Sequence, residues 1–230
     1  MSANIAVCSF GRKQSQRCPN KMLRPFAETT LTDLILEKLA RGQWEAFFAG
    51  YEEAFERKSR QHGVRFVQRD ERSATIDEPI VEILSFLRGL PYEHVLLVSA
   101  CSPFLRVDTI QRFLDDCLAH DCQPAFSVAR RRDYFMTLKG EPINFDPAKK
   151  TINTKTVEPI YEFCHMLYFF NRDYFFTHGT YWDWRQVRLI ELPDGVELVD
   201  IDTEEDFILA ETLWRLRPSD VELATKGAVG

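Results

Sequence analysis

The sequence predicts an α/β fold, in which a doubly wound, mostly parallel sheet carries helices on both faces as a three-layer sandwich. Two observations support this fold class. Short apolar runs alternate with segments of helical periodicity over about the first 130 residues. One run, HVLLVSA at 94–100, is almost continuously apolar, as expected for a strand buried on both faces. The 230 residues suit one domain, which we place at 1–216.

The elements follow one another in a regular order. Apolar runs predict strands at 4–10, 45–50, 64–69, 94–100 and 124–130. Between them, helical periodicity predicts helices at 30–43, 51–63, 78–90 and 107–120. After an irregular stretch, strands are expected at 187–193 and 196–201, followed by a helix at 203–216. Thr203 is a suitable N-cap for this last helix, with Asp206 as its reciprocal partner.

The alternation stops between residues 131 and 176, where short runs, loops and aromatic residues dominate. We interpret this stretch as an insert rather than as a second domain. Residues 217–230 are polar or small and predict a flexible tail.

Composition excludes several classes of protein. A net charge of −6 argues against a generic nucleic-acid binder. The six cysteines form no C-x-x-C pair and no zinc-ligand spacing, which favours reduced thiols and a cytoplasmic protein. No stretch approaches the about 20 apolar residues of a membrane span, and the N-terminus does not resemble a secretory leader.

A basic loop, GRKQSQRCPNK at 11–21, directly follows the first predicted strand. Ligands of open α/β sheets bind at this edge, beyond the carboxyl ends of the strands. The cations of the loop repel one another unless an anion joins them, and arginine grips phosphate oxygens bidentately. The loop is neither a Walker loop nor a dinucleotide fingerprint. Phosphate binding and a solvated basic turn therefore remain equal alternatives on position alone.

Two aspartates, Asp200 and Asp202, end the predicted strand at 196–201. Residues two apart on a strand share a face, with about 6–7 Å between their Cα atoms. Close carboxylates repel unless a cation or proton lies between them, and Mg²⁺ prefers a few carboxylates plus phosphate oxygens. Helix capping alone would explain Asp202 or Thr203, but it leaves Asp200 unexplained.

These stretches together resemble the CMP-sialic acid synthetases and the related KDO and other sugar-acid cytidylyltransferases. The basic loop is similar to the family motif ARGGSKRIPRKN and keeps its Arg12, Ser15, Arg17, Pro19 and Lys21. The loop SACSPFLR at 99–106 resembles QPTSPLR, and DIDTEEDFILAE at 200–211 closely matches DIDTPEDLELAE. QRDERSATIDEP at 68–79 and CHMLYFF at 164–170 are looser matches.

The resemblance implies a glycosyltransferase-A-like, Rossmann-like nucleotidyltransferase that transfers CMP from CTP to a sugar-acid hydroxyl and releases pyrophosphate. It implies that Asp200 and Asp202 hold Mg²⁺, and that they act in catalysis together with Arg12 and Lys21. The nucleotide would contact Arg12, Ser15, Arg17, Lys21, Arg69, Asp77, Ser102 and Pro103, and the acceptor would contact His165 and Tyr168. It further implies a homodimer in which the insert reaches the partner.

Departures from the motifs leave alternatives open. The loop lacks the family's glycine pair, the glutamine of QPTSPLR is absent, and Cys164–His165 replaces an Asn-Gly pair. The altered positions lie mainly toward the acceptor, which favours an acceptor other than ordinary N-acetylneuraminic acid. A transferase that uses another nucleotide or acceptor, and a non-catalytic nucleotide-binding relative, are the competing hypotheses. The sequence also predicts that Asp200 and Asp202 face the basic loop across the sheet edge.

Overall fold

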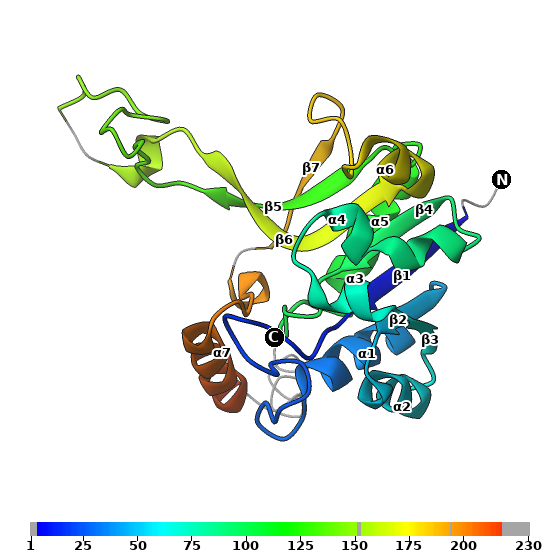
Figure 1. Ribbon diagram of the computed structural model, residues 1–230. Helices are drawn as coiled ribbons and strands as arrows, with labels where there is room; N and C mark the ends of the chain where they lie inside the picture. Colours follow the sequence, from blue (N-terminus) through cyan, green and yellow to red (C-terminus); the bar gives the residue numbers. More distant parts are fainter. Residues whose placement is uncertain (1–3, 151–152, 194, 218–230) are drawn as a thin grey trace, which may run out of the picture.

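The computed structural model describes residues 4–150, 153–193 and 195–217. Its centre is a seven-stranded sheet with the order β3-β2-β1-β4-β6-β5-β7 (Figure 1). The strands are β1 (Ile5–Phe10), β2 (Ala46–Gly50), β3 (Arg65–Gln68), β4 (His94–Val98), β5 (Ala125–Arg131), β6 (Ile160–Asn171) and β7 (Arg188–Glu191). Only β6 runs antiparallel to its neighbours, β4 and β5. The predicted α/β fold with a mostly parallel sheet is confirmed.

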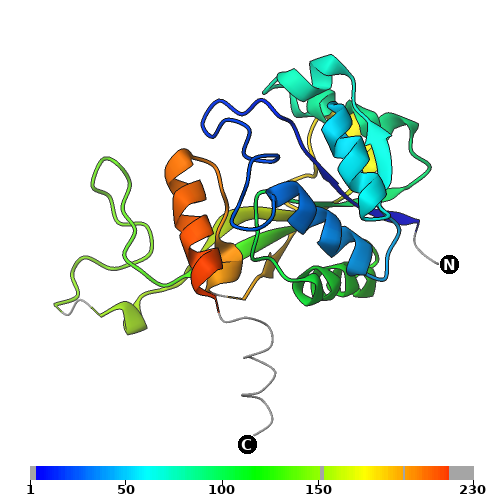
Figure 2. The ribbon, with the colours of Figure 1, turned by 90° about the horizontal axis from the view of Figure 1, so that it is seen from below.

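Helices flank the sheet on both sides (Figure 2). The α-helices are α1 (Leu31–Arg41), α2 (Glu53–Gln61), α3 (Glu71–Thr75), α4 (Ile80–Ile83), α5 (Val107–Ala119), α6 (Arg172–His178) and α7 (Glu204–Leu216). Short 3₁₀ turns are η1 (Ser85–Gly89), η2 (Thr154–Thr156) and η3 (Val196–Leu198). None of the helices in the described ranges is long and apolar enough to cross a membrane.

The central strands β1 and β4 contribute side chains to two separate cores, one on each face of the sheet, because successive side chains of a strand point to opposite faces. Val7 and Leu96 pack with α1, α2, α5 and α7 in the larger core. Cys8 and Leu97, one position further, pack with η1 and α6 in the smaller core. The near-continuous apolar runs of β1 and β4 are explained by burial on both faces.

Two predicted elements are wrong in detail. Residues 196–201 form no strand: η3 occupies their first half, and a single backbone bond joins Ile201 N to Cys101 O. A run ending VDI has strand-like composition, but it pairs with no strand of the sheet. The helix expected at 78–90 is instead the short α4 followed by η1.

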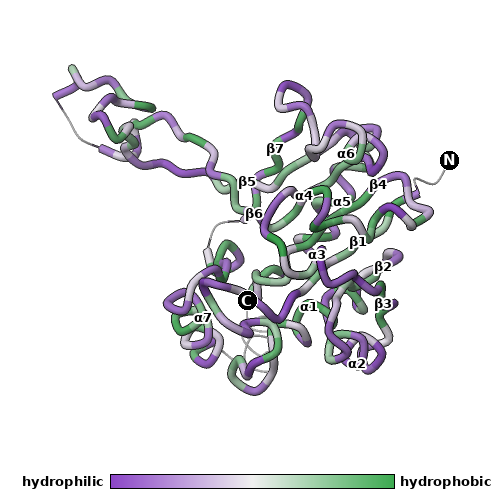
Figure 3. The backbone as a smooth tube through the Cα atoms, viewed as in Figure 1, coloured by the Kyte–Doolittle hydropathy of each residue, from purple (hydrophilic) through white to green (hydrophobic). Residues whose placement is uncertain are grey.

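The irregular stretch is shorter than the expected 131–176, because β6 and α6 account for residues 160–178 and β6 pairs inside the sheet. Residues 132–150 and 153–159 lie in an arm that projects away from the sheet beyond β5 and β6 (Figure 1). Polar and apolar segments alternate along this arm (Figure 3). Asn144, largely buried, ties the arm together through bonds to the Asp133 and Glu158 carbonyls. The expected tail lies almost entirely outside the described residues.

Candidate active site

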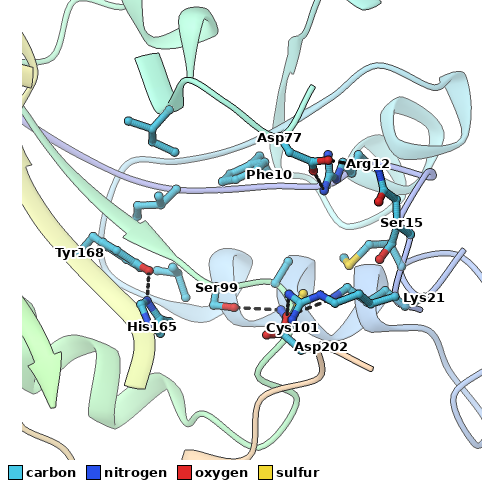
Figure 4. A pocket seen from close by; sticks show the side chains of 18 of the residues that line it. Phe10, Arg12, Ser15, Lys21, Asp77, Ser99, Cys101, His165, Tyr168 and Asp202 are labelled. Atoms are coloured by element: carbon cyan, nitrogen blue, oxygen red, sulfur yellow. Dashed lines mark hydrogen bonds and ion pairs between the residues drawn. The ribbon is translucent and has the colours of Figure 1, made fainter. Parts of the chain in front are cut away.

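A cavity of about 560 Å³ opens at the carboxyl ends of β1 and β4 (Figure 4). One end, which we call the charged end, contains Arg12, Arg17, Lys21, Asp77 and Asp202. The other, the aromatic end, contains His165, Tyr168 and Tyr181. Further lining residues are Phe10, Gly11, Ser15, Gln16, Met22, Ile80, Leu97, Val98, Ser99, Ala100 and Cys101.

The basic loop leaves β1 at Gly11, where the chain passes against the second strand. Gly11 N donates to Ala49 O, and a side chain at Gly11 would come within 3.0 Å of the Phe48 ring. The buried Arg69 donates to the Gly11 carbonyl and to the Ser73 and Ile83 carbonyls. Arg69 is therefore placed behind the loop as a support and not in the cavity, where the nucleotide-binding prediction had placed it.

Each cation of the charged end already has an internal partner. Arg12 donates to the Ile76 carbonyl at 3.0 Å and forms an ion pair of 2.5 Å with Asp77. Arg17 lies 3.0 Å from Asp202. These two positive charges of the loop are thus paired with carboxylates of the same cavity.

Lys21 joins the loop to the acidic segment. Its ammonium donates to the Ile201 carbonyl and lies 3.8 Å from the Asp202 carboxylate. The Lys21 side chain is 12% exposed, so these contacts are shielded from solvent. For Asp202, the prediction that the acidic segment faces the basic loop is confirmed.

The two aspartates point to different partners. Asp200 accepts a hydrogen bond of 3.2 Å from the Ser102 hydroxyl, and Ser99 Oγ lies 3.5 Å from the same oxygen. Burial raises the pKa of Asp200, and the neighbouring Asp202 charge raises it further, whereas Lys21 lowers it. Asp202 is half-exposed and lies at the charged end.

The capping of α7 fixes this acidic segment. Thr203 accepts from Asp206 N, and Asp206 accepts from the Thr203 and Asp202 amides. The predicted capping box is confirmed. Capping therefore uses Thr203 and Asp206 and leaves both Asp200 and Asp202 carboxylates free of this duty.

The loop after β4, which contains Ser102 and Pro103, is held by a residue that the sequence did not indicate. Lys38 of α1 donates to the Ser102 and Pro103 carbonyls, both at 2.8 Å. Burial lowers the pKa of Lys38 to about 7, opposed by the Glu197 charge. Ser102 and Pro103 do not line the cavity themselves, so Ser102 contributes by positioning Asp200. A lysine in an amphipathic helix gives no sequence signal for this task.

The aromatic end depends on an irregularity in β6. The β5–β6 register shifts between Phe126 and Val128, and His165 adopts φ +48°, a left-handed value uncommon outside glycine. The buried Ser127 hydroxyl accepts from the Met166 and Leu167 amides at this shift. This bulge brings His165 to the cavity wall.

Within the aromatic end, His165 Nδ1 lies 2.8 Å from the Tyr168 hydroxyl. Tyr168 packs against Phe126, Tyr181 and Trp182. Burial raises the pKa of Tyr168 well above its usual range, so the phenol stays neutral and can hydrogen-bond His165. The sequence pointed to His165 and Tyr168 but not to Tyr181 or Ser127.

Cys101 also lines the cavity, beside Lys21 and the two aspartates. Burial raises the pKa of its thiol to about 11, so the thiol is protonated at neutral pH and is a poor nucleophile. This agrees with its interpretation as a small filler.

A magnesium ion suits the oxygen donors of this site. Among the described residues, no group of three or more His, Cys, Asp and Glu side chains could hold a metal. Mg²⁺, however, is commonly bound by one or two carboxylates with substrate phosphates and water. Asp202 lines the cavity and is a carboxylate of this kind, and Asp200, two residues earlier, lies behind it, where burial first and the Asp202 charge second raise its pKa.

Comparison with known families decides the class of this site. Residues 11–177 match the family model described as the MobA-like NTP transferase domain. The chain belongs to that family. The matched range begins at the basic loop and ends beyond β6, so it includes most of the cavity wall, but not Phe10, Tyr181 or the acidic segment. The family makes the chain a nucleotidyltransferase. A comparison with curated proteins found no match.

Solved structures share the fold over nearly the whole chain. CMP:2-keto-3-deoxy-manno-octonic acid synthetase complexed with CTP has a TM-score of 0.67 at 11% identity, covering 93% of this chain and 99% of the other. 4-Diphosphocytidyl-2C-methyl-D-erythritol synthase from Anaerococcus prevotii has a TM-score of 0.62 at 14% identity, with 93% and 96% covered. A cytidylyltransferase from Leptospira borgpetersenii has a TM-score of 0.62 at 14% identity, with 98% and 95% covered. At these identities the likeness establishes the fold alone.

Proposed function

We propose that this nucleotidyltransferase transfers CMP from CTP to a hydroxyl of a sugar acid of the nonulosonic or KDO type. The observation that carries the proposal is the charged end of the cavity, where a basic loop and an acidic segment meet at the carboxyl edge of the sheet. The three structurally similar proteins are named as synthetases or transferases of cytidylyl groups, which supports CTP as the nucleotide.

In the proposed reaction, the acceptor hydroxyl oxygen attacks the α-phosphorus of CTP. The bond from that phosphorus to the bridging oxygen breaks, and pyrophosphate leaves with the electron pair. Arg12, Arg17 and Lys21 neutralise the triphosphate, which lowers the cost of bringing an anionic nucleophile close. A bound Mg²⁺ would supply further charge neutralisation through Asp200 and Asp202.

The acceptor is assigned to the aromatic end. Tyr168 and Tyr181 offer ring faces to a sugar, and His165 offers a ring nitrogen to a hydroxyl or carboxylate. The proton of the attacking hydroxyl passes to a carboxylate of the acidic segment, of which Asp202 lines the cavity and Asp200 lies behind it.

The arm is assigned to a homodimer contact. Met136, Leu138 and Ile143 are exposed on it, with Leu138 entirely so. Exposed apolar side chains on a projecting segment favour association with another protein surface. Sedimentation of the intact chain and of a Leu138→Asp variant tests this assignment, because a dimer through the arm dissociates when a charge enters the contact.

The function is tested by incubating the protein with Mg²⁺, each of CTP, UTP, ATP and GTP, and a panel of nonulosonic acids, KDO and phosphonates. Pyrophosphate release and mass spectrometry of the nucleotidyl product are the measurements. We expect a CMP product with a sugar acid, and its loss in Asp202→Asn.

Two outcomes would contradict the proposal in different ways. If a product forms with another nucleotide or with a phosphonate, the proposed transferase reaction stands, but the proposed substrates are wrong. No product with any pair, together with CTP binding that ignores Mg²⁺ and Asp202→Asn in calorimetry, identifies a non-catalytic nucleotide-binding relative.

A further inference from the structure

The ion pair between Arg17 and Asp202 joins two residues with competing tasks. Both line the charged end, and the guanidinium lies 3.0 Å from the carboxylate. In the proposed function, Arg17 grips the triphosphate and Asp202 ligates the metal ion. A carboxylate paired with a guanidinium is a weaker metal ligand, because the guanidinium already bonds to its oxygen atoms and neutralises their negative charge.

Resting on that proposed function, we propose that Arg17 is an exchange residue. It neutralises Asp202 in the nucleotide-free protein and moves to the triphosphate when nucleotide binds. This movement releases Asp202 for the metal ion. Arg17 thereby couples the affinity for the metal to the affinity for the nucleotide, so that each ligand promotes binding of the other.

Arg17 is suited to this movement because solvent surrounds it. Its side chain is 65% exposed and that of Asp202 is 48% exposed. Ion pairs of this kind contribute little net stability, so a multiply charged ligand can break them. Within the ranges that the structure describes, Asp202 is the single acidic partner of Arg17.

The other two cations of the charged end are held more firmly. Lys21 is 12% exposed and also donates to the Ile201 carbonyl. Arg12 combines its ion pair to Asp77 with a hydrogen bond to the Ile76 carbonyl. Lys21 and Arg12 therefore keep their positions as fixed parts of the site, and the exchange is specific to Arg17.

The thermodynamic consequence is reciprocal. If nucleotide binding removes Arg17 from Asp202, the metal ion binds the nucleotide complex without having to displace Arg17. Metal binding then increases the affinity for the nucleotide by the same factor. Replacing Arg17 by a neutral residue removes the closer of the two cations that compete for Asp202 in the free protein and leaves Lys21 at 3.8 Å. The ratio of metal affinities with and without nucleotide must then fall.

The experiment measures Mn²⁺ binding by electron paramagnetic resonance, with and without CTP, and CTP binding by calorimetry. The variants are Arg17→Gln and, as a matched control, Lys13→Gln. Lys13 is an exposed cation of the same loop that does not line the cavity. We expect Arg17→Gln to bind Mn²⁺ alone about threefold tighter than the unaltered protein, an effect within the range of an exposed ion pair. Its ratio of affinities with and without CTP should fall by a similar factor.

The outcomes separate the two proposals. Unchanged Mn²⁺ affinity in Arg17→Gln, with normal CTP binding by the unaltered protein, overturns the exchange and leaves the proposed function intact. An equal gain in Lys13→Gln also overturns the exchange, because general loss of positive charge would explain it. Failure of the unaltered protein to bind CTP at any metal concentration overturns both.

Discussion

The two ends of the cavity are built by opposite means. At the charged end, the side chains come from loops and are held by ion pairs that solvent reaches, such as Arg17 with Asp202. At the aromatic end, His165 and Tyr168 come from the sheet strand β6, and they are held by packed rings around Tyr168 and by the Ser127 hydroxyl. The first arrangement permits exchange of partners during binding, whereas the second fixes a shape.

This difference predicts different consequences of mutation. Loss of a charge at the first end should reduce activity and leave the fold almost unaffected, because exposed pairs contribute little to stability. Loss of a ring at the second end should reduce the free energy of unfolding, because buried aromatic contacts stabilise the core.

The largest effect is expected for Lys21→Met. This change removes the ammonium that links the basic loop to Ile201 and Asp202, while keeping most of the apolar stem. We expect kcat/KM to fall about 100-fold or more, as for removal of a preorganised charge at a phosphoryl-transfer site. The free energy of unfolding should change by only about 1 kcal/mol. Nucleotidyl transfer kinetics and urea denaturation measure the two quantities. Lys13→Met is the control. An equal loss of activity in that variant would show that the effect comes from the charge of the loop in general and not from the position of Lys21.

The next effect is expected for Trp182→Ala. Trp182 is 3% exposed and contacts the rings of Phe126, Tyr168 and Tyr181. Its removal leaves a cavity and should reduce the free energy of unfolding by about 3–5 kcal/mol in chemical denaturation. Trp184, 64% exposed, provides the matched control, and Trp184→Ala should cost far less. Equal decreases in the free energy of unfolding for the two variants would show that packing of rings at the aromatic end does not stabilise the fold.

The smallest effect is expected for Tyr168→Phe, which keeps the ring and removes the hydroxyl that bonds His165 Nδ1. We expect the KM for the acceptor to rise about tenfold, since one hydrogen bond orients His165, with unchanged affinity for CTP. Steady-state kinetics with each substrate varied in turn makes the measurement. A rise only in the KM for CTP would contradict the assignment of the acceptor to the aromatic end and of the nucleotide to the charged end.

Much of the charged end could be predicted from the sequence. The basic loop after the first strand, the capping box at Thr203 and Asp206, and the approach of Asp202 to the loop all follow from local patterns and from the edge of the sheet. The strand at 196–201 could not be excluded, because its composition suits a strand, whereas the folded chain forms the 3₁₀ turn η3 there and leaves it outside the sheet. Arg69 was assigned to the nucleotide because a sequence motif does not reveal burial.

The sequence by itself determined the alternation of strands and helices over about the first 130 residues, the capped start of α7 and the chemistry of the basic and acidic segments. These depend on contacts within a few residues. The tertiary structure decided where β6 inserts, how its bulge places His165, and which cation reaches which acid. Those features depend on contacts such as that between Lys21 and Ile201, which are 180 positions apart. No local pattern encodes such a contact, because it exists only when the folded sheet brings both segments to the same edge.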